Sequence, residues 1–204
     1  MLMKLDNIAL TGRVLGVLLY APPESDECRA LLATMADPVW LAEWPYGENQ
    51  AAAQLIAEGI KDQQSETLCE AYQRLFVGPY ALPAPPWGSV YLDKENVLFG
   101  DSTLRLRKWL RNNGIDTQRE QNEPEDHLGT LLMMAAWLAE EQQGRLLQAL
   151  LSQHLLPWAP RFLSLLEQHA VHPFYLGLAQ LAQSTLSAWA EQCSEPVVEL
   201  ELHF

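Results

Sequence analysis

Residues 122–127, with the sequence NEPEDH, place three carboxylates and one histidine within six positions. Such a group could bind a cation or carry out acid–base chemistry. The pattern predicts the start of a helix over 123–141, where the helix dipole would stabilise the Glu123 carboxylate. Asp126 and His127 are adjacent and would point about 100° apart on that helix, an awkward geometry for an acid–base pair. No serine or cysteine nucleophile motif accompanies them, so a hydrolase or lyase that uses Asp126 and His127 is kept only as an alternative.

The sequence lacks the ligand spacing that is typical of a metal centre. Glu123 and His127 would share one helix face at i, i+4, but no second histidine lies nearby. The cysteines Cys28, Cys69 and Cys193 are far apart and form no C-x-x-C pair, which predicts free thiols in a reducing compartment. Neither glycine-rich phosphate-binding motif, G-x-x-x-x-G-K-[ST] or G-x-G-x-x-G, is present. We therefore expect neither a metal nor another cofactor.

A second candidate group lies in and before a proline-rich segment. Four prolines in 77–92 (VGPYALPAPPWGSVYL) exclude regular helix and central strand, which predicts a stiff loop of about sixteen residues. Aromatic side chains on such a rigid loop lose little conformational entropy when they bind a peptide. The other interpretation is that Phe76 and Trp87 fill the core while the prolines end helices. The candidate residues of this group are Tyr72, Leu75, Phe76, Tyr80, Pro86, Trp87 and Gly88.

Helices must position both groups, because apolar residues recur at helical spacing along most of the chain. Besides a first helix that ends before Pro22, the predicted helices cover about 26–35, 38–44, 48–60, 65–76, 101–113, 123–141, 145–170 with a break at 157–160, and 173–193. Residues 196–202 (PVVELEL) alternate like a strand but have nothing to pair with, so we interpret them as a tail. The expected fold is all-α, a single-domain bundle over 1–204 of about eight to twelve helices with one long proline-rich loop.

Charge and hydropathy exclude several function classes. The net charge of −13 opposes binding to nucleic acid and favours a basic partner. The imbalance is larger in the second half, since residues 112–204 carry 3 basic and 12 acidic side chains. The longest apolar run, 131–139, is about half as long as a bilayer requires, so the protein is not expected to be integral to a membrane. Asp6 and Arg13 interrupt the apolar N-terminus, which argues against a secretory leader and predicts a cytoplasmic protein.

Two stretches of the sequence carry a family resemblance. YQRLFVGPYALPAPPWGSVYLDKENVLFGDSTLRLRKWL, followed by NEPEDHLG, resembles the TorD/DmsD family of redox-enzyme maturation chaperones, dimethyl sulfoxide reductase type. The resemblance implies an all-α chaperone without enzymatic turnover. Such a chaperone binds the twin-arginine signal peptide of a molybdenum-cofactor oxidoreductase and delays export until the cofactor is inserted. The residues at positions that match the family's leader-binding surface are Tyr72, Leu75, Phe76, Tyr80, Pro86, Trp87, Asp126 and His127.

The residues and the resemblance suggest one mechanism. A twin-arginine leader carries two arginines followed by an apolar segment, so its receptor needs carboxylates beside an aromatic groove. We expect Asp126 and Glu123 to supply the carboxylates. The groove is expected to be lined by Trp87, Tyr80, Phe76 and Leu75. The twin-arginine translocase is a further possible partner. The resemblance also raises guanine nucleotide binding, for which the sequence has no recognisable loop. The remaining alternative is a structural subunit of the reductase complex.

Overall fold

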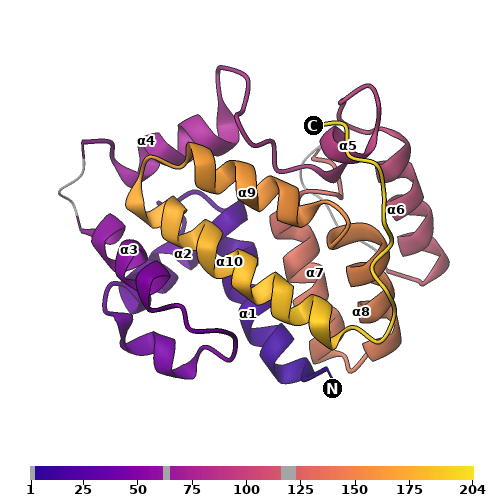
Figure 1. Cartoon of the computed structure of the whole chain (residues 1–204), viewed down its shortest axis with the longest axis horizontal. Helices are drawn as coiled ribbons and strands as arrows, with labels where there is room; N and C mark the ends of the chain where they lie inside the picture. The colour runs from indigo at the N-terminus through magenta and orange to yellow at the C-terminus, as the bar shows by residue number, and fades with distance from the viewer. Residues whose placement is uncertain (1–2, 62–64, 116–122) are drawn as a thin grey trace.

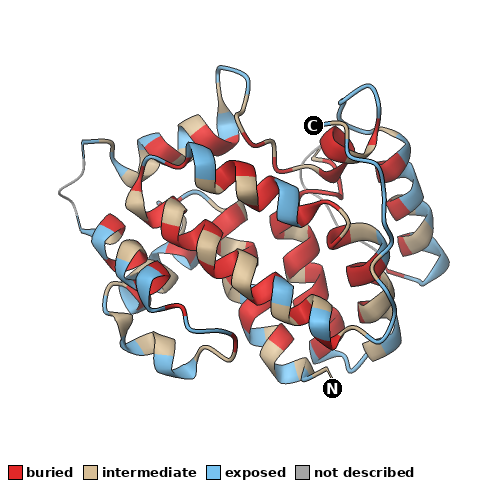
Figure 2. Cartoon of the chain, in the orientation of Figure 1, coloured by how far each residue is buried: buried red, intermediate tan, exposed pale blue. Residues whose placement is uncertain are grey.

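The computed structural model describes residues 3–61, 65–115 and 123–204, and it is all-α as predicted (Figure 1). Ten α-helices, one 3-10 helix and two π-helical segments occur among the described residues, without a β-strand. Trp87 and His127 form an isolated antiparallel bridge there. Apolar helix faces bury a single contiguous core, in which Trp158 and Trp189 are the largest fully buried side chains (Figure 2).

Helices α1 (Leu5–Tyr20) and α7 (Leu128–Glu140) pack along each other at the centre of the fold. Small residues let their backbones approach closely. A Cβ atom added to Gly12 would lie 2.8 Å from the Leu132 carbonyl oxygen, and one added to Gly129 would lie 2.8 Å from the Gly16 carbonyl oxygen. This close packing holds the start of α7, next to His127, against the end of α1.

Helix α10 (Pro173–Gln192) forms a second centre of packing, against α3 (Gln50–Ile60) and α9 (Ala159–His169). The remaining elements surround these two centres (Figure 1). They are α2 (Asp26–Met35), η1 (Pro38–Glu43), α4 (Leu68–Tyr72), the π-helix η2 (Gln73–Val77), α5 (Gly88–Leu92), α6 (Asp101–Asn112), α8 (Gly144–Leu150) and the π-helix η3 (Leu151–Leu155).

The prediction of a helix over 123–141 is wrong at its beginning, because α7 begins only at Leu128. The preceding residues form a turn held by contacts to distant segments rather than by a helix dipole. Glu125 pairs with Arg107 of α6, with 2.5 Å between Oε2 and Nε. The side chain of His127 is the cap of α7, since its Nδ1 accepts the Gly129 N–H at 3.1 Å.

The predicted loop over 77–92 is shorter than expected. It leaves η2 at Gly78, whose φ of 109° suits glycine. It then runs only to Trp87, because residues 88–92 form α5. The prolines exclude helix up to position 86, but Gly88 and the residues after it carry no such restriction.

Residues 196–202 form a tail without strand pairing, as predicted, and the C-terminal segment 194–204 packs back onto the body. Figure 1 shows it running from the end of α10 past α8 to α5. The Val198 N–H donates to the Ser152 carbonyl at 3.0 Å, and the His203 N–H donates to the Tyr91 carbonyl at 2.8 Å.

Candidate functional site

The two candidate groups, far apart in sequence, meet where the proline-rich loop enters α5. The Leu128 N–H donates to the Pro86 carbonyl at 2.8 Å, and the Gly88 N–H donates to the Asp126 carbonyl at 3.0 Å. Trp87 and His127 lie between these two bonds and form the isolated bridge. The tertiary structure thus joins the segments that the sequence analysis singled out.

Asp126 lies inside this junction rather than on the surface. Its side chain is buried, and Oδ2 accepts the Ser89 N–H at 2.6 Å. Oδ1 is buried without a hydrogen bond of its own. Burial raises the pKa of this carboxyl, and the Ser89 amide and the Ser89 and Thr103 hydroxyls only partly oppose that effect. The carboxylate predicted to meet an arginine is therefore shielded from solvent.

His127 is a buried, neutral cap. Its ring meets the rings of Tyr20 and Trp87 edge-on, with centroids 5.1 and 5.7 Å away. Burial lowers its pKa to about 3, although a Glu123 carboxylate oxygen lies 4.0 Å from Nε2. Since Nδ1 already accepts the Gly129 N–H and Asp126 bonds to Ser89, these two side chains do not form an acid–base dyad.

Aromatic side chains extend this group from the end of α4 into η2. Tyr72 stacks on Phe76 with ring centroids 5.5 Å apart, and its hydroxyl donates to the Tyr20 carbonyl at 2.8 Å. Phe76 is buried, and so is Leu75. Tyr20 was missed by the sequence analysis because it ends the first helix far from either candidate segment, and no local pattern marks it.

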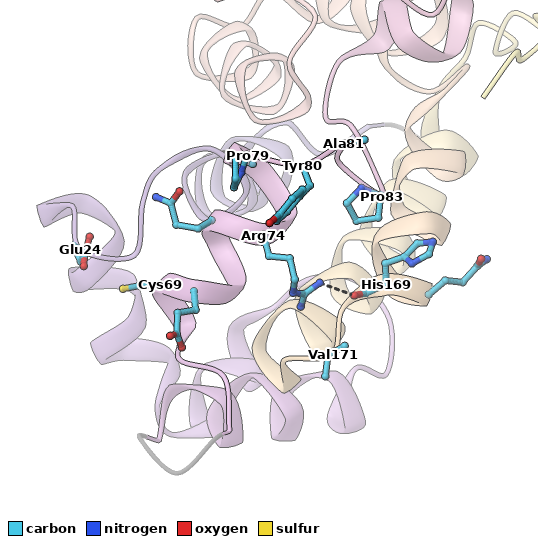
Figure 3. A pocket seen from close by; sticks show the side chains of 13 residues that line it. Glu24, Cys69, Arg74, Pro79, Tyr80, Ala81, Pro83, His169 and Val171 are labelled. Atoms are coloured by element: carbon cyan, nitrogen blue, oxygen red, sulfur yellow. Dashed lines mark hydrogen bonds between the residues drawn. The ribbon is translucent and has the colours of Figure 1, made fainter.

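Tyr80 lies elsewhere, in a groove of about 860 Å³ between α4, the start of the proline-rich loop and the end of α9 (Figure 3). Its side chain is 87% exposed, the most exposed large hydrophobic side chain among the described residues. Pro79 and Pro83 line the groove on the same loop, and Val171, also exposed, lines the opposite side. The groove thus places an exposed aromatic side chain beside walls that mix apolar residues with charged ones.

Some of the charged side chains in this groove already bind other residues of the protein. Arg74 is held by Glu66, with 2.6 Å between Nε and Oε1, and donates to the His169 carbonyl at 3.1 Å (Figure 3). This pairing raises the pKa of Arg74 and lowers that of Glu66. Glu70, which lines the groove, bonds to Thr67 as a helix cap. Glu24 is a further carboxylate on the groove wall.

A second, smaller cavity of about 410 Å³ lies under the C-terminal tail. Gly88 and Asp126 line it, together with His154 and the tail residues Val198 and Leu200. Burial lowers the pKa of His154 to about 4, and the nearby Arg105 acts in the same direction. His154 is therefore neutral near pH 7.

The structure thus separates the ten predicted site residues by their accessibility. Tyr80 is exposed, whereas Tyr72, Trp87 and Glu123 are partly buried. The buried ones are Leu75, Phe76, Pro86, Gly88, Asp126 and His127. In the described part of the chain, no three histidine, cysteine, aspartate or glutamate side chains lie close enough to hold a metal ion.

Comparison with known proteins identifies the family. Residues 45–164 match the model of the family described as nitrate reductase delta subunit. The Tat proofreading chaperone DmsD of Salmonella typhi is 52% identical over 94% of this chain and 93% of its own. The probable Tat proofreading chaperone DmsD of Haemophilus influenzae is 41% identical over 91% of each chain. The chain belongs to the TorD/DmsD family.

The structure and the family names support the fold and the functional class. A redox enzyme maturation protein from Archaeoglobus fulgidus shares the fold, with a TM-score of 0.56 at 19% identity over 92% of this chain and 96% of its own. Members of the TorD/DmsD family carry the names of chaperones rather than catalysts, which favours the chaperone over the hydrolase or lyase alternative. Within the described residues, no helix is long and apolar enough to span a membrane.

Proposed function

We propose that this TorD/DmsD chaperone binds the twin-arginine signal peptide of a molybdenum-cofactor oxidoreductase, of the dimethyl sulfoxide reductase type. It holds back export in the cytoplasm until the cofactor is inserted. The observation that carries the proposal is the groove of about 860 Å³ beneath Tyr80, an aromatic side chain that is 87% exposed on a proline-rich loop. Aromatic side chains that enter a partner's contact surface are among the residues that contribute most to binding.

The proline-rich loop connects the groove at Tyr80 with the cavity at Asp126, the two sites proposed to bind the leader. Tyr80 near its start lines the groove, and Gly88 just after its end lines the cavity that reaches Asp126. The apolar segment of the leader would cover Tyr80. An arginine of the leader would donate to Oδ1 of Asp126, which has no hydrogen bond in the structure. Glu123 and Glu24 add negative charge near the two ends of this path. A charge-assisted bond of this type contributes about 1.5–3 kcal/mol.

The twin-arginine translocase follows as a proposed second partner, since a chaperone that holds a leader must release it there. Guanine nucleotide has no comparable support, because the sequence contains no phosphate-binding glycine loop. A structural subunit would copurify with the exported reductase, whereas the proposed chaperone should be absent from it.

The test is calorimetric titration with leader peptides of candidate reductases, each beside a version in which lysine replaces both arginines. We expect a one-to-one complex, weakened when the arginines are replaced.

Tyr80→Ala should weaken binding by about 2 kcal/mol and leave the unfolding free energy unchanged, because the side chain is exposed. Val39→Ala, at an apolar side chain 74% exposed on η1, is the matched control and should bind normally. Equal affinity of wild type and Tyr80→Ala would exclude the groove as the leader site.

A further inference from the structure

The tail lies across the body as a bound peptide would. Its residues 198–204 are extended, and two of its backbone N–H groups donate to carbonyls of the body, those of Ser152 and Tyr91. Its apolar side chains alternate with acidic and polar ones (VELELHF), so that every second residue can face the body. Phe204 meets the Tyr91 ring edge-on, with centroids 5.5 Å apart.

The segment covers the cavity that contains Asp126. Val198 and Leu200 line this cavity of about 410 Å³ together with Gly88, Arg105 and Asp126. Asp126 is one of the residues that line this cavity, and its Oδ1 atom is buried without a hydrogen bond. A cationic group that approaches Oδ1 from this side therefore meets the tail first.

Few hydrogen bonds hold the tail: besides the two backbone bonds, the Arg161 Nε–H donates to the Phe204 carbonyl at 3.1 Å. Val198 and Leu200 each remain 41% exposed, and Phe204 remains 40% exposed. Core side chains such as that of Leu131 are completely buried, whereas the apolar side chains of the tail are only partly covered by the body. Such a segment can leave the body without unfolding it.

We propose that residues 196–204 act as a displaceable internal competitor, which occupies the approach to Asp126 until a twin-arginine leader replaces it. This inference rests on the proposed function. The occupant that replaces the tail is an extended segment of the leader. Its backbone N–H groups donate to the Ser152 and Tyr91 carbonyls in place of those of the tail. Its apolar side chains replace Val198 and Leu200, and one of its arginines donates to Asp126 Oδ1.

Competition predicts that loosening the tail strengthens leader binding. The apparent dissociation constant is the intrinsic one divided by the fraction of molecules with the tail displaced. Leu200→Ser should therefore bind the leader peptide at least about fivefold more tightly than wild type. Phe204→Ala, which loosens the other end of the tail, should act in the same direction. Glu199→Gln, at an exposed side chain of the same segment, is the matched control and should change affinity much less.

Hydrogen exchange follows the tail directly. The amides of Val198 and His203 should be protected in the free protein and exchange faster when the leader saturates it. A leader with both arginines replaced by glutamine should bind every variant more weakly, because Asp126 then has no cationic partner, but it should keep the same fold-gain from Leu200→Ser as long as it displaces the tail. Asp126→Asn should likewise lower the intrinsic affinity and leave that fold-gain in place.

The outcomes separate this inference from the proposed function. If the leader binds all variants with wild-type affinity and the tail amides stay protected, the tail is no competitor, whereas the leader-binding function stands. If Leu200→Ser binds more weakly, the tail is part of the leader site, and the inference is wrong. If no leader binds any variant, the proposed function fails and this inference fails with it.

Discussion

At the scale of single residues, burial decides what each predicted side chain can do. Asp126 and His127 look alike in sequence, as adjacent ionisable residues before an apolar helix. In the structure Asp126 accepts the Ser89 N–H, while His127 caps α7. Both are buried, so burial raises the pKa of the acid and lowers that of the base. Both shifts favour the neutral form, as expected where water is excluded.

The shift of His127 makes stability depend on pH. Its folded pKa of about 3 lies below the unfolded value of about 6.5, so protonation favours the unfolded state as the pH falls below 6.5. This histidine should cost about 2 kcal/mol of unfolding free energy between pH 7 and pH 5. His127→Asn, which keeps a side-chain cap but does not titrate, should lose that part of the decline.

The measurement is urea unfolding of each protein at both pH values. His169→Asn, at an exposed histidine, is the control and should decline as wild type does. Asp126, whose raised pKa stabilises the folded state as the pH falls, is present in all three proteins and cancels in the comparison. An identical decline in wild type and His127→Asn would mean that His127 is protonated in the folded state.

At the scale of elements, the close contact of α1 with α7 positions the site. Gly129 follows the cap residue His127 by two positions, and a Cβ atom there would lie 2.7 Å from the Tyr20 Cβ. Tyr20 in turn contacts the His127 ring and accepts the Tyr72 hydroxyl. The glycine thus sets how closely three parts of the candidate site approach one another.

Gly129→Ala should therefore destabilise the fold by about 1–3 kcal/mol, the usual cost of overpacking. Thermal unfolding measures this loss. Gly144→Ala is the matched control, since no atom lies within 4 Å of its added Cβ, and it should be neutral or slightly stabilising. A Gly129→Ala protein as stable as wild type would show that the two helices can move apart without cost.

At the scale of the whole molecule, the charge favours a basic peptide over most other partners. The net charge of −13 produces a field that attracts the arginines of a leader before any contact forms. The association rate should therefore fall steeply between low and physiological ionic strength, while the dissociation rate changes less. Stopped-flow mixing with a fluorescent leader measures both rates.

A leader whose arginines are replaced by glutamine should show a weaker salt dependence and serves as the control. A rate that stays constant with salt for both peptides would mean that apolar contacts alone capture the leader.

Local chemistry was sufficient to predict the helical fold and several element ends. Pro22 follows the end of α1, and Gly114, with a φ of 68°, follows the end of α6. The start of α7 was misjudged, because Pro124 and its acidic neighbours suit the first turn of a helix equally well. Only the bonds to Pro86 and to α6 decide that they form a turn instead.

The sequence by itself thus determined the all-α class, the charge of the molecule and the two segments that form the candidate site. Only the tertiary structure decided that Asp126 is shielded, that Tyr80 is exposed above a groove, and that the tail covers a cavity. The physical reason is that helix formation depends on neighbours within about four residues, whereas burial depends on whichever distant segments pack there. The wall of the groove opposite Tyr80 comes from Val171, and the cover of the Asp126 cavity comes from Val198 and Leu200.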